Sequence, residues 1–189
     1  MKNIPLFELP VMVMMIFIKV IMLRRVGIKA NVLGKSGKTD YVLIPVVLFF
    51  GYAALSAFLD WPFPAIASKP FWDANILHWF ASAICTISLI LLGFSLKSFG
   101  KSFRMGIDRQ TKNQLITTGV FAYSRNPVFV SFIIYFLGIF LGNSNMVTAA
   151  LALLSMLMIH RQILREEVFL KKHYGEEYEA YCRRVRRYF

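Results

Sequence analysis

The sequence has little with which to build a disulfide framework or a metal centre. Its 189 residues include only two cysteines, Cys85 within an apolar run and Cys182 in a basic segment, and they form no CxxC pair. The three histidines, His78, His160 and His173, are scattered and form no HxxxH pair. We therefore expect neither a structural disulfide nor a bound metal.

Charge is also scarce for a soluble protein. Charged residues make up 17% of the chain and hydrophobic residues 57%, and the mean hydropathy is +0.56. Soluble domains average about a quarter charged residues. The net charge of +12 could suggest nucleic acid as a partner. The basic residues lie in the gaps between apolar runs, however, which favours an integral membrane protein and no nucleic acid.

Apolar runs recur along the whole chain. Five can be marked, at residues 5–23, 41–59, 76–96, 128–142 and 146–159. The first three are long enough to span a bilayer, whereas the last two fall short of the roughly 20 residues that a perpendicular helix needs. Only Asn143, Ser144 and Asn145 separate these two. The pattern predicts an all-α membrane protein with about five transmembrane helices, the last two forming a tight hairpin.

The basic residues predict an orientation. Lysines and arginines crowd the first and third gaps and the segment after Ile159, whereas the second gap has only Lys69. Because positive charge marks the cytoplasmic side, we expect the N-terminus outside and the C-terminus in the cytoplasm. The first run carries Glu8, has no small-x-small cleavage site and ends at Arg24 and Arg25, which predicts a retained span and not a signal peptide.

The segment after the fifth run has helical spacing. Ile163, Leu164, Phe169 and Leu170 continue the apolar pattern, so the fifth helix is expected to project beyond the bilayer, and Gly175 can end it. A second amphipathic helix should begin at Glu176 and Glu177. Its expected apolar stripe is Tyr178, Tyr181 and Val185, and its expected headgroup ligands are Arg183, Arg184, Arg186 and Arg187.

Residues 114–129, QLITTGVFAYSRNPVF, form the most informative segment. Asn126 suits an N-cap position and Pro127 the first turn of the fourth apolar helix, and this could be their whole role. The same geometry would also present free backbone N–H groups and a positive dipole end at the membrane surface. A ligand carboxylate or phosphate could bind there.

A second group of charges follows the fifth run. Arg161 and Arg165 are four residues apart and could be snorkelling anchors. Glu167 precedes Lys171 by one turn, which predicts an ordinary ion pair. Glu166 has no cation at helical spacing, so its carboxylate needs water or a specific partner.

The pattern LITTGVFAYSRNPVF, a hydrophobic hairpin and then REEVFLKKHYGEEYEAYCRRV resembles the isoprenylcysteine carboxyl methyltransferase and phospholipid methyltransferase superfamily. The resemblance covers roughly residues 99–185. It implies an integral membrane enzyme that uses S-adenosylmethionine. Together with the apolar runs, it predicts one membrane domain, 1–189, with three spans in 1–96 and the cofactor loop, hairpin and C-terminal helices in 97–189.

Carried over by position, the resemblance assigns site residues. It implies cofactor contacts at Gln114, Leu115, Ile116, Phe121, Asn126, Pro127 and Phe129. The family commonly has His where this chain has Asn126, and Tyr where it has Phe121 or Phe129. Glu167 or Glu166 would serve the cofactor, and Arg161 the acceptor. We predict Arg161 and Glu166 as catalytic residues and Glu167 as a further cofactor contact.

Methyl transfer from a sulfonium needs mainly the positioning of donor and acceptor. A carboxylate acceptor would need a cation such as Arg161 to orient it. An amine acceptor would have to lose a proton, and Glu166 could then act as the base. Prenylated protein C-termini, phospholipid amines and small thiols all remain open as acceptors, and the oligomeric state is open too. The alternatives are a non-enzymatic membrane adaptor or transporter subunit, and an NADPH-dependent enzyme of the sterol-reductase type.

Overall fold

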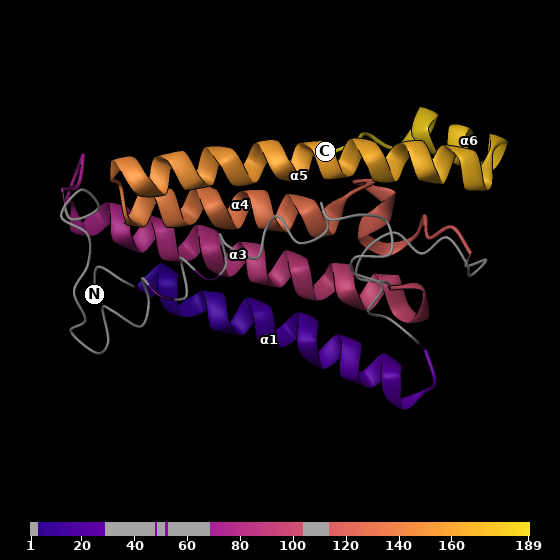
Figure 1. Ribbon diagram of the computed structural model, residues 1–189, viewed down its shortest axis with the longest axis horizontal. Helices are drawn as coiled ribbons and strands as arrows, with labels where there is room; N and C mark the ends of the chain where they lie inside the picture. The colour runs from indigo at the N-terminus through magenta and orange to yellow at the C-terminus, as the bar shows by residue number, and fades with distance from the viewer. Residues whose placement is uncertain (1–3, 29–47, 49–51, 53–68, 104–113) are drawn as a thin grey trace.

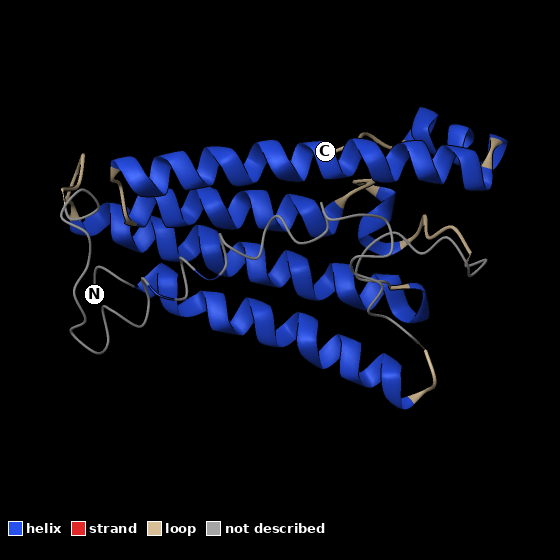
Figure 2. Cartoon of the chain, in the orientation of Figure 1, coloured by secondary structure: helices blue, strands red, loops and turns tan. Residues whose placement is uncertain are grey.

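The computed structural model describes residues 4–28, 48, 52, 69–103 and 114–189. All regular structure in this part of the chain is helical (Figures 1 and 2). The long helices are α1 (Ile4–Arg25), α3 (Asn75–Phe99), α4 (Pro127–Gly142) and α5 (Met146–Tyr174). The short ones are α6 (Glu176–Arg184) and the 3-10 turns η3 (Gly100–Ser102) and η4 (Gly119–Ala122).

Four of the five predicted apolar runs are helices. The runs at 5–23, 76–96, 128–142 and 146–159 lie within α1, α3, α4 and α5. The run at 41–59 lies almost entirely outside the described residues. By length and composition, α3 and α5 could each cross a membrane, and α4 is a shorter apolar helix. Exposed side chains such as Ile87, Ile90 and Leu157 give α3 and α5 apolar outer faces.

Small residues bring α3 and α4 close together. On α3, the buried stripe includes Ala81, Cys85, Ser88 and Ser95, and the hydroxyl of Ser88 donates to the carbonyl of Ser131 on α4 at 2.7 Å. Gly138 of α4 faces the same stripe, where an added Cβ would collide with the sulfur of Cys85. Such residues let helix backbones approach closely. This pair forms the most extensive helix contact in the described part of the chain.

The expected tight hairpin joins α4 to α5. Asn145 is the N-cap of α5, and its side chain accepts a hydrogen bond from the backbone N–H of Thr148 at 2.9 Å. The Thr148 hydroxyl in turn accepts a hydrogen bond from the backbone N–H of Asn145, which completes a capping box. The three residues from Asn143 to Asn145 are therefore enough to reverse the chain.

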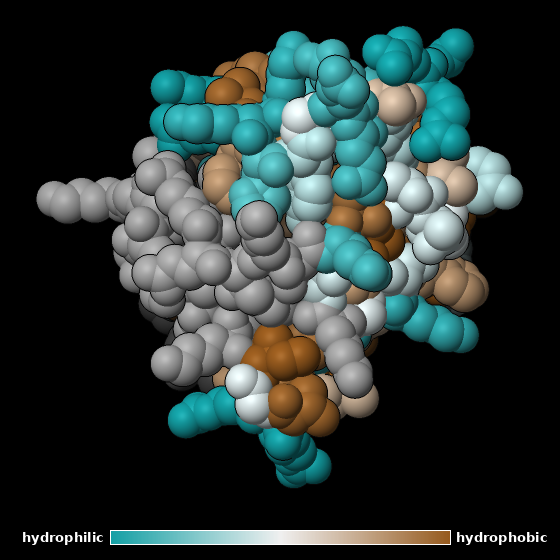
Figure 3. All heavy atoms as spheres, turned by 90° about the vertical axis from the view of Figure 1, so that its right-hand side faces the viewer, coloured by the Kyte–Doolittle hydropathy of each residue, from teal (hydrophilic) through white to brown (hydrophobic). Residues whose placement is uncertain are grey.

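Helix α5 continues past its apolar part, as predicted, and ends at Gly175, whose φ is +54°. A positive φ is readily adopted only by glycine, so this residue suits the sharp turn into α6. Figure 1 shows the end of α3, the start of α4, the last part of α5 and α6 at the same end of the bundle. Seen from this end, polar side chains cover much of the described surface (Figure 3).

Candidate active site

The loop that precedes α4 is fixed between α3 and α6. Gly119, in η4, has a φ of +63°, and a Cβ at this position would collide with the side chain of Ser98 on α3. Phe121 is buried with its ring edge-on to Phe99, at 4.7 Å between centroids. The hydroxyl of Tyr181 on α6 donates to the carbonyl of Phe121 at 2.6 Å. The loop therefore presents residues 124–127 in a fixed position.

Asn126 is the N-cap residue of α4 and Pro127 occupies its first turn, as the sequence predicts. The expected capping hydrogen bond is absent, however, because the Asn126 amide points away from the helix. Its Nδ2 donates at 3.2 Å both to Oε1 of Glu167 and to the carbonyl of Arg187. Asn126 is 6% exposed, so this amide links the loop to α5 and to the segment after α6.

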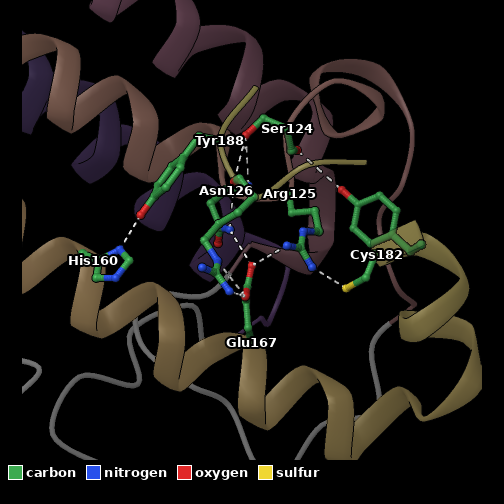
Figure 4. A network of polar contacts seen from close by, with 9 residues as sticks. Ser124, Arg125, Asn126, His160, Glu167, Cys182 and Tyr188 are labelled. Carbon is green, nitrogen blue, oxygen red and sulfur yellow. Dashed lines mark hydrogen bonds and ion pairs between the residues drawn. The ribbon is translucent and has the colours of Figure 1, made fainter. Parts of the chain in front are cut away.

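Glu167 is the centre of this polar cluster. Its side chain is buried, and each carboxylate oxygen has an arginine partner (Figure 4). Oε1 lies 3.4 Å from Nη2 of Arg125, and Oε2 lies 2.8 Å from Nη2 and 2.9 Å from Nε of Arg187. The hydrogen bond to Glu167 raises the pKa of the Arg187 guanidinium above its ordinary value. One carboxylate and two guanidinium groups leave the cluster with a net positive charge.

The predicted Glu167–Lys171 ion pair is wrong. Lys171 instead pairs with Glu179 of α6, at 2.9 Å. The buried stripe of α5 explains the difference, because it runs through Thr148, Ala152, Ser155, Ile159, Ile163 and Glu167. Glu167 therefore points into the bundle toward Arg125, whereas Lys171 is exposed at the end of the helix.

The two predicted catalytic residues lie outside this cluster. Arg161 is on the exposed side of α5, and Glu166 is half-buried. Glu166 has the specific partner that the sequence left unidentified, because Nε2 of Gln162 donates to its Oε1 at 3.1 Å. Of the two glutamates left open, Glu167 is the one that the structure brings to Asn126.

The apolar stripe of α6 packs inward. Tyr178, Tyr181 and Val185 are buried, and their partly buried neighbours are Leu115, Leu170, Tyr174 and Cys182. Burial raises the pKa of the Tyr178 hydroxyl above its ordinary range and that of Tyr181 to about 12. The predicted cofactor residue Leu115 thus belongs to the packing that attaches α6 to the loop.

The other predicted contacts are dispersed. Gln114 is exposed and Ile116 is half-buried, whereas Phe129 packs into the main core with its ring edge-on to Phe132. Sequence reasoning missed Arg125 and Arg187. Arg125 directly precedes Asn126, and a basic residue beside a predicted site was the available signal. Arg187 gave no such signal, because it is one of four arginines that resemble headgroup ligands.

The cluster has polar groups suited to the cofactor that the resemblance implies. Within the cluster, Nε of Arg125 is buried without a hydrogen-bond partner. Unpaired buried donors are costly unless a ligand or water satisfies them. S-adenosylmethionine carries a carboxylate, an ammonium group and a sulfonium. A site with arginine donors, an amide and a carboxylate fits these groups.

Comparisons with known proteins identify the family. A family model described as phospholipid methyltransferase matches residues 76–177, which is more than half of the chain. Protein-S-isoprenylcysteine O-methyltransferase B of Arabidopsis thaliana is 30% identical over 128 residues, covering 64% of each chain. The Schizosaccharomyces pombe protein-S-isoprenylcysteine O-methyltransferase is 33% identical over 89 residues, covering 46% of this chain and 38% of that protein.

The match to a probable protein-S-isoprenylcysteine O-methyltransferase of Oryza sativa subsp. indica spans only 60% of that relative's length, at 29% identity over 116 residues and 57% of this chain. A solved structure of a eukaryotic intramembrane Ras methyltransferase, an isoprenylcysteine carboxyl methyltransferase, has a similar fold. The TM-score is 0.58 at 21% identity, over 78% of this chain and 51% of that one.

Proposed function

The chain belongs to the phospholipid methyltransferase family, and on this premise we propose that it is an integral membrane methyltransferase. Its donor would be S-adenosylmethionine and its acceptor a lipidic or small hydrophobic molecule. One observation carries the proposal: Asn126 and Glu167, 41 positions apart, meet at 3.2 Å at the polar end of an apolar bundle. Both were expected from the resemblance to serve the cofactor.

The geometry supports separate binding sites for the carboxylate and the ammonium group of the donor. Arg125 and the free N–H groups at the start of α4 would receive the donor's carboxylate, since both present positive charge. Glu167 and the Asn126 amide would bind its ammonium group or hydroxyls. When bound, S-adenosylmethionine supplies an electrophilic methyl group on a positive sulfur. The residues around it need only hold donor and acceptor in line.

The acceptor would approach from the bilayer. Arg161 lies on the exposed side of α5, a few residues beyond the apolar part of this helix. There its guanidinium could orient a carboxylate at the membrane boundary. Glu166, five residues further along α5, could take a proton from an amine acceptor. The isoprenylcysteine methyltransferases among the relatives make a prenylated cysteine carboxylate the first acceptor to test.

Calorimetric titration of the purified, folded protein with S-adenosylhomocysteine tests donor binding. Turnover is then measured with radiolabelled S-adenosylmethionine against a farnesylated cysteine, phospholipid amines in vesicles and a small apolar thiol. We expect heat on titration and labelled product from one acceptor class. A folded sample that gives no heat and labels none of the three would contradict the proposal.

A further inference from the structure

Residues 186–189 follow α6 and fold back across the candidate site; we call them the strap. The backbone N–H of Arg125 donates to the carbonyl of Arg186 at 3.0 Å, and the Asn126 amide donates to the carbonyl of Arg187. The Arg187 guanidinium binds Glu167. Beyond it, the Tyr188 hydroxyl contacts Nδ1 of His160 on α5 (Figure 4). The strap is thus held at the loop, at Glu167 and at His160.

The strap satisfies the groups that the proposed function assigns to the donor. Both oxygens of Glu167 are engaged, and Asn126 is 6% exposed. A ligand that contacts Glu167 and Asn126 must therefore displace one of their present partners. The two arginines differ in exposure, because the side chain of Arg187 is 36% exposed and that of Arg125 is 13% exposed. Displacing Arg187 costs less than displacing Arg125, since water can solvate the more exposed guanidinium group.

Arg187 also resembles the ligand in charge. It places a cationic N–H group on Oε2 of Glu167, at 2.8 Å, and a donor ammonium group would make the same kind of contact. The base of the strap is fixed, because Val185 is buried and its N–H donates to the carbonyl of Tyr181 at 3.0 Å. Movement can therefore be confined to the residues after Val185 while α6 keeps its packing.

We propose that Arg187 is a built-in competitor of the methyl donor: the strap occupies Glu167 and Asn126 in the free protein and swings away when the donor binds. This inference rests on the proposed function and adds regulation to the same site. The Tyr188–His160 contact is a second anchor that sets how often the strap opens. Donor affinity is then reduced by the fraction of molecules that are closed.

The test measures S-adenosylhomocysteine binding to full-length variants by stopped-flow or surface plasmon resonance. Arg187→Gln removes the competing charge but leaves Arg125 to neutralise Glu167, so we expect about three- to tenfold tighter binding through faster association. Tyr188→Phe loosens one anchor and should raise the association rate about twofold or more. Arg184→Gln is the matched control, because Arg184 is an exposed arginine of α6, and its binding should equal that of the wild type.

A second measurement follows the strap itself. Hydrogen–deuterium exchange of the Arg125 backbone N–H, which donates to the carbonyl of Arg186, should increase when S-adenosylhomocysteine saturates the wild-type protein, and should already be faster in free Tyr188→Phe. Faster exchange on binding would not arise if Arg187 simply contributed to the binding site, because ligand contacts would then slow it.

The outcomes separate the two proposals. Weaker binding by Arg187→Gln with an unchanged melting temperature would make Arg187 a ligand contact and overturn its role as competitor. If the wild type binds S-adenosylhomocysteine and both Arg187→Gln and Tyr188→Phe bind it equally well, the competition proposal is overturned and the proposed function stands. If no form of the folded protein binds S-adenosylhomocysteine, the proposed function fails, and the competition proposal fails with it.

Discussion

At the scale of single residues, the buried carboxylate of Glu167 should carry both stability and donor binding. Glu167→Gln leaves the guanidinium groups of Arg125 and Arg187 without a counter-charge, which we expect to cost roughly 2–4 kcal/mol of unfolding free energy. S-adenosylhomocysteine affinity should fall at least about tenfold, because a charged hydrogen-bond acceptor is lost. Thermal unfolding in detergent and calorimetry measure the two effects.

Glu179→Gln is the matched control for that substitution. It also removes a glutamate from an ion pair, but the Lys171–Glu179 pair lies on the surface. Exposed pairs contribute little, so neither the melting temperature nor the affinity should change measurably. Equal effects of the two substitutions would show that the cluster around Glu167 has no special role.

Tyr181 should make stability fall at alkaline pH. Burial raises its pKa from 10.0 to about 12, so the folded protein keeps the hydroxyl protonated while the unfolded chain ionises near 10. A group with a raised pKa in the folded state contributes fully to the free energy of unfolding below its pKa in the unfolded chain. This contribution is lost as the pH rises, here between about 10 and 12. The melting temperature, followed across this range, should fall less in Tyr181→Phe than in the wild type.

At neutral pH, Tyr181→Phe should instead cost about 1 kcal/mol, because the hydrogen bond to the Phe121 carbonyl is lost. Tyr123→Phe is the control, because it also removes a tyrosine hydroxyl, but from an exposed side chain of the loop. Identical alkaline profiles for wild type and Tyr181→Phe would contradict the assignment.

The site could be predicted from the sequence only in part. Asn126 and Glu167 were predicted as cofactor contacts from the family resemblance, and the structure brings the two side chains together. The sequence left the choice between Glu166 and Glu167 open, although Glu167 continues the buried spacing through Ile159 and Ile163. That spacing was the missed signal. The contribution of Arg187 depends on how the chain folds back after α6, and local sequence patterns do not encode such a long-range contact.

At the scale of the helices, the close approach of α3 and α4 depends on Gly138. A Cβ at this position would meet the sulfur of Cys85 and, at 3.2 Å, the carbonyl of Ala81. Backbone atoms cannot move aside as a flexible side chain can, so Gly138→Ala should destabilise the protein by roughly 1–3 kcal/mol. The melting temperature in detergent measures this loss.

Gly93 of α3 offers a matched control on a helix of the same bundle. A Cβ there meets only the terminal methyl group of Met15, at 3.2 Å, and this side chain is flexible. Alanine also has the higher helix propensity, by up to about 1 kcal/mol. Gly93→Ala should therefore be neutral or stabilising, and a loss equal to that of Gly138→Ala would argue against a special α3–α4 contact.

The helices themselves follow closely from the apolar pattern. The runs at 76–96 and 128–142 predict α3 and α4 to within a few residues, and the hairpin follows from the short polar link at 143–145. The pattern could not show which way α6 faces. Its tyrosine stripe suits either a membrane surface or a protein core, and only packing against Leu115 and Leu170 decides between them.

At the scale of the whole molecule, basic residues from separate elements gather at one end. Arg24 and Arg25 end α1, Lys97 lies in the last turn of α3, and α6 closes with Arg183 and Arg184. In Figure 1, these helix ends lie on the side where α6 lies. Since positive residues are retained in the cytoplasm, we predict that this end, with the candidate site, is cytoplasmic.

Cysteine labelling in sealed membranes tests this orientation. In a Cys182→Ser background, Lys172→Cys places a thiol at the exposed end of α5. Lys69→Cys places one six residues before α3, and the start of this helix lies at the opposite end of the bundle (Figure 1). A membrane-impermeant maleimide should label Lys172→Cys only in inside-out vesicles and Lys69→Cys only in right-side-out vesicles. The buried Cys85 of the background should stay unlabelled in both. The opposite pattern would place the site outside the cytoplasm, where soluble S-adenosylmethionine made in the cytoplasm could not reach Glu167 without crossing the bilayer.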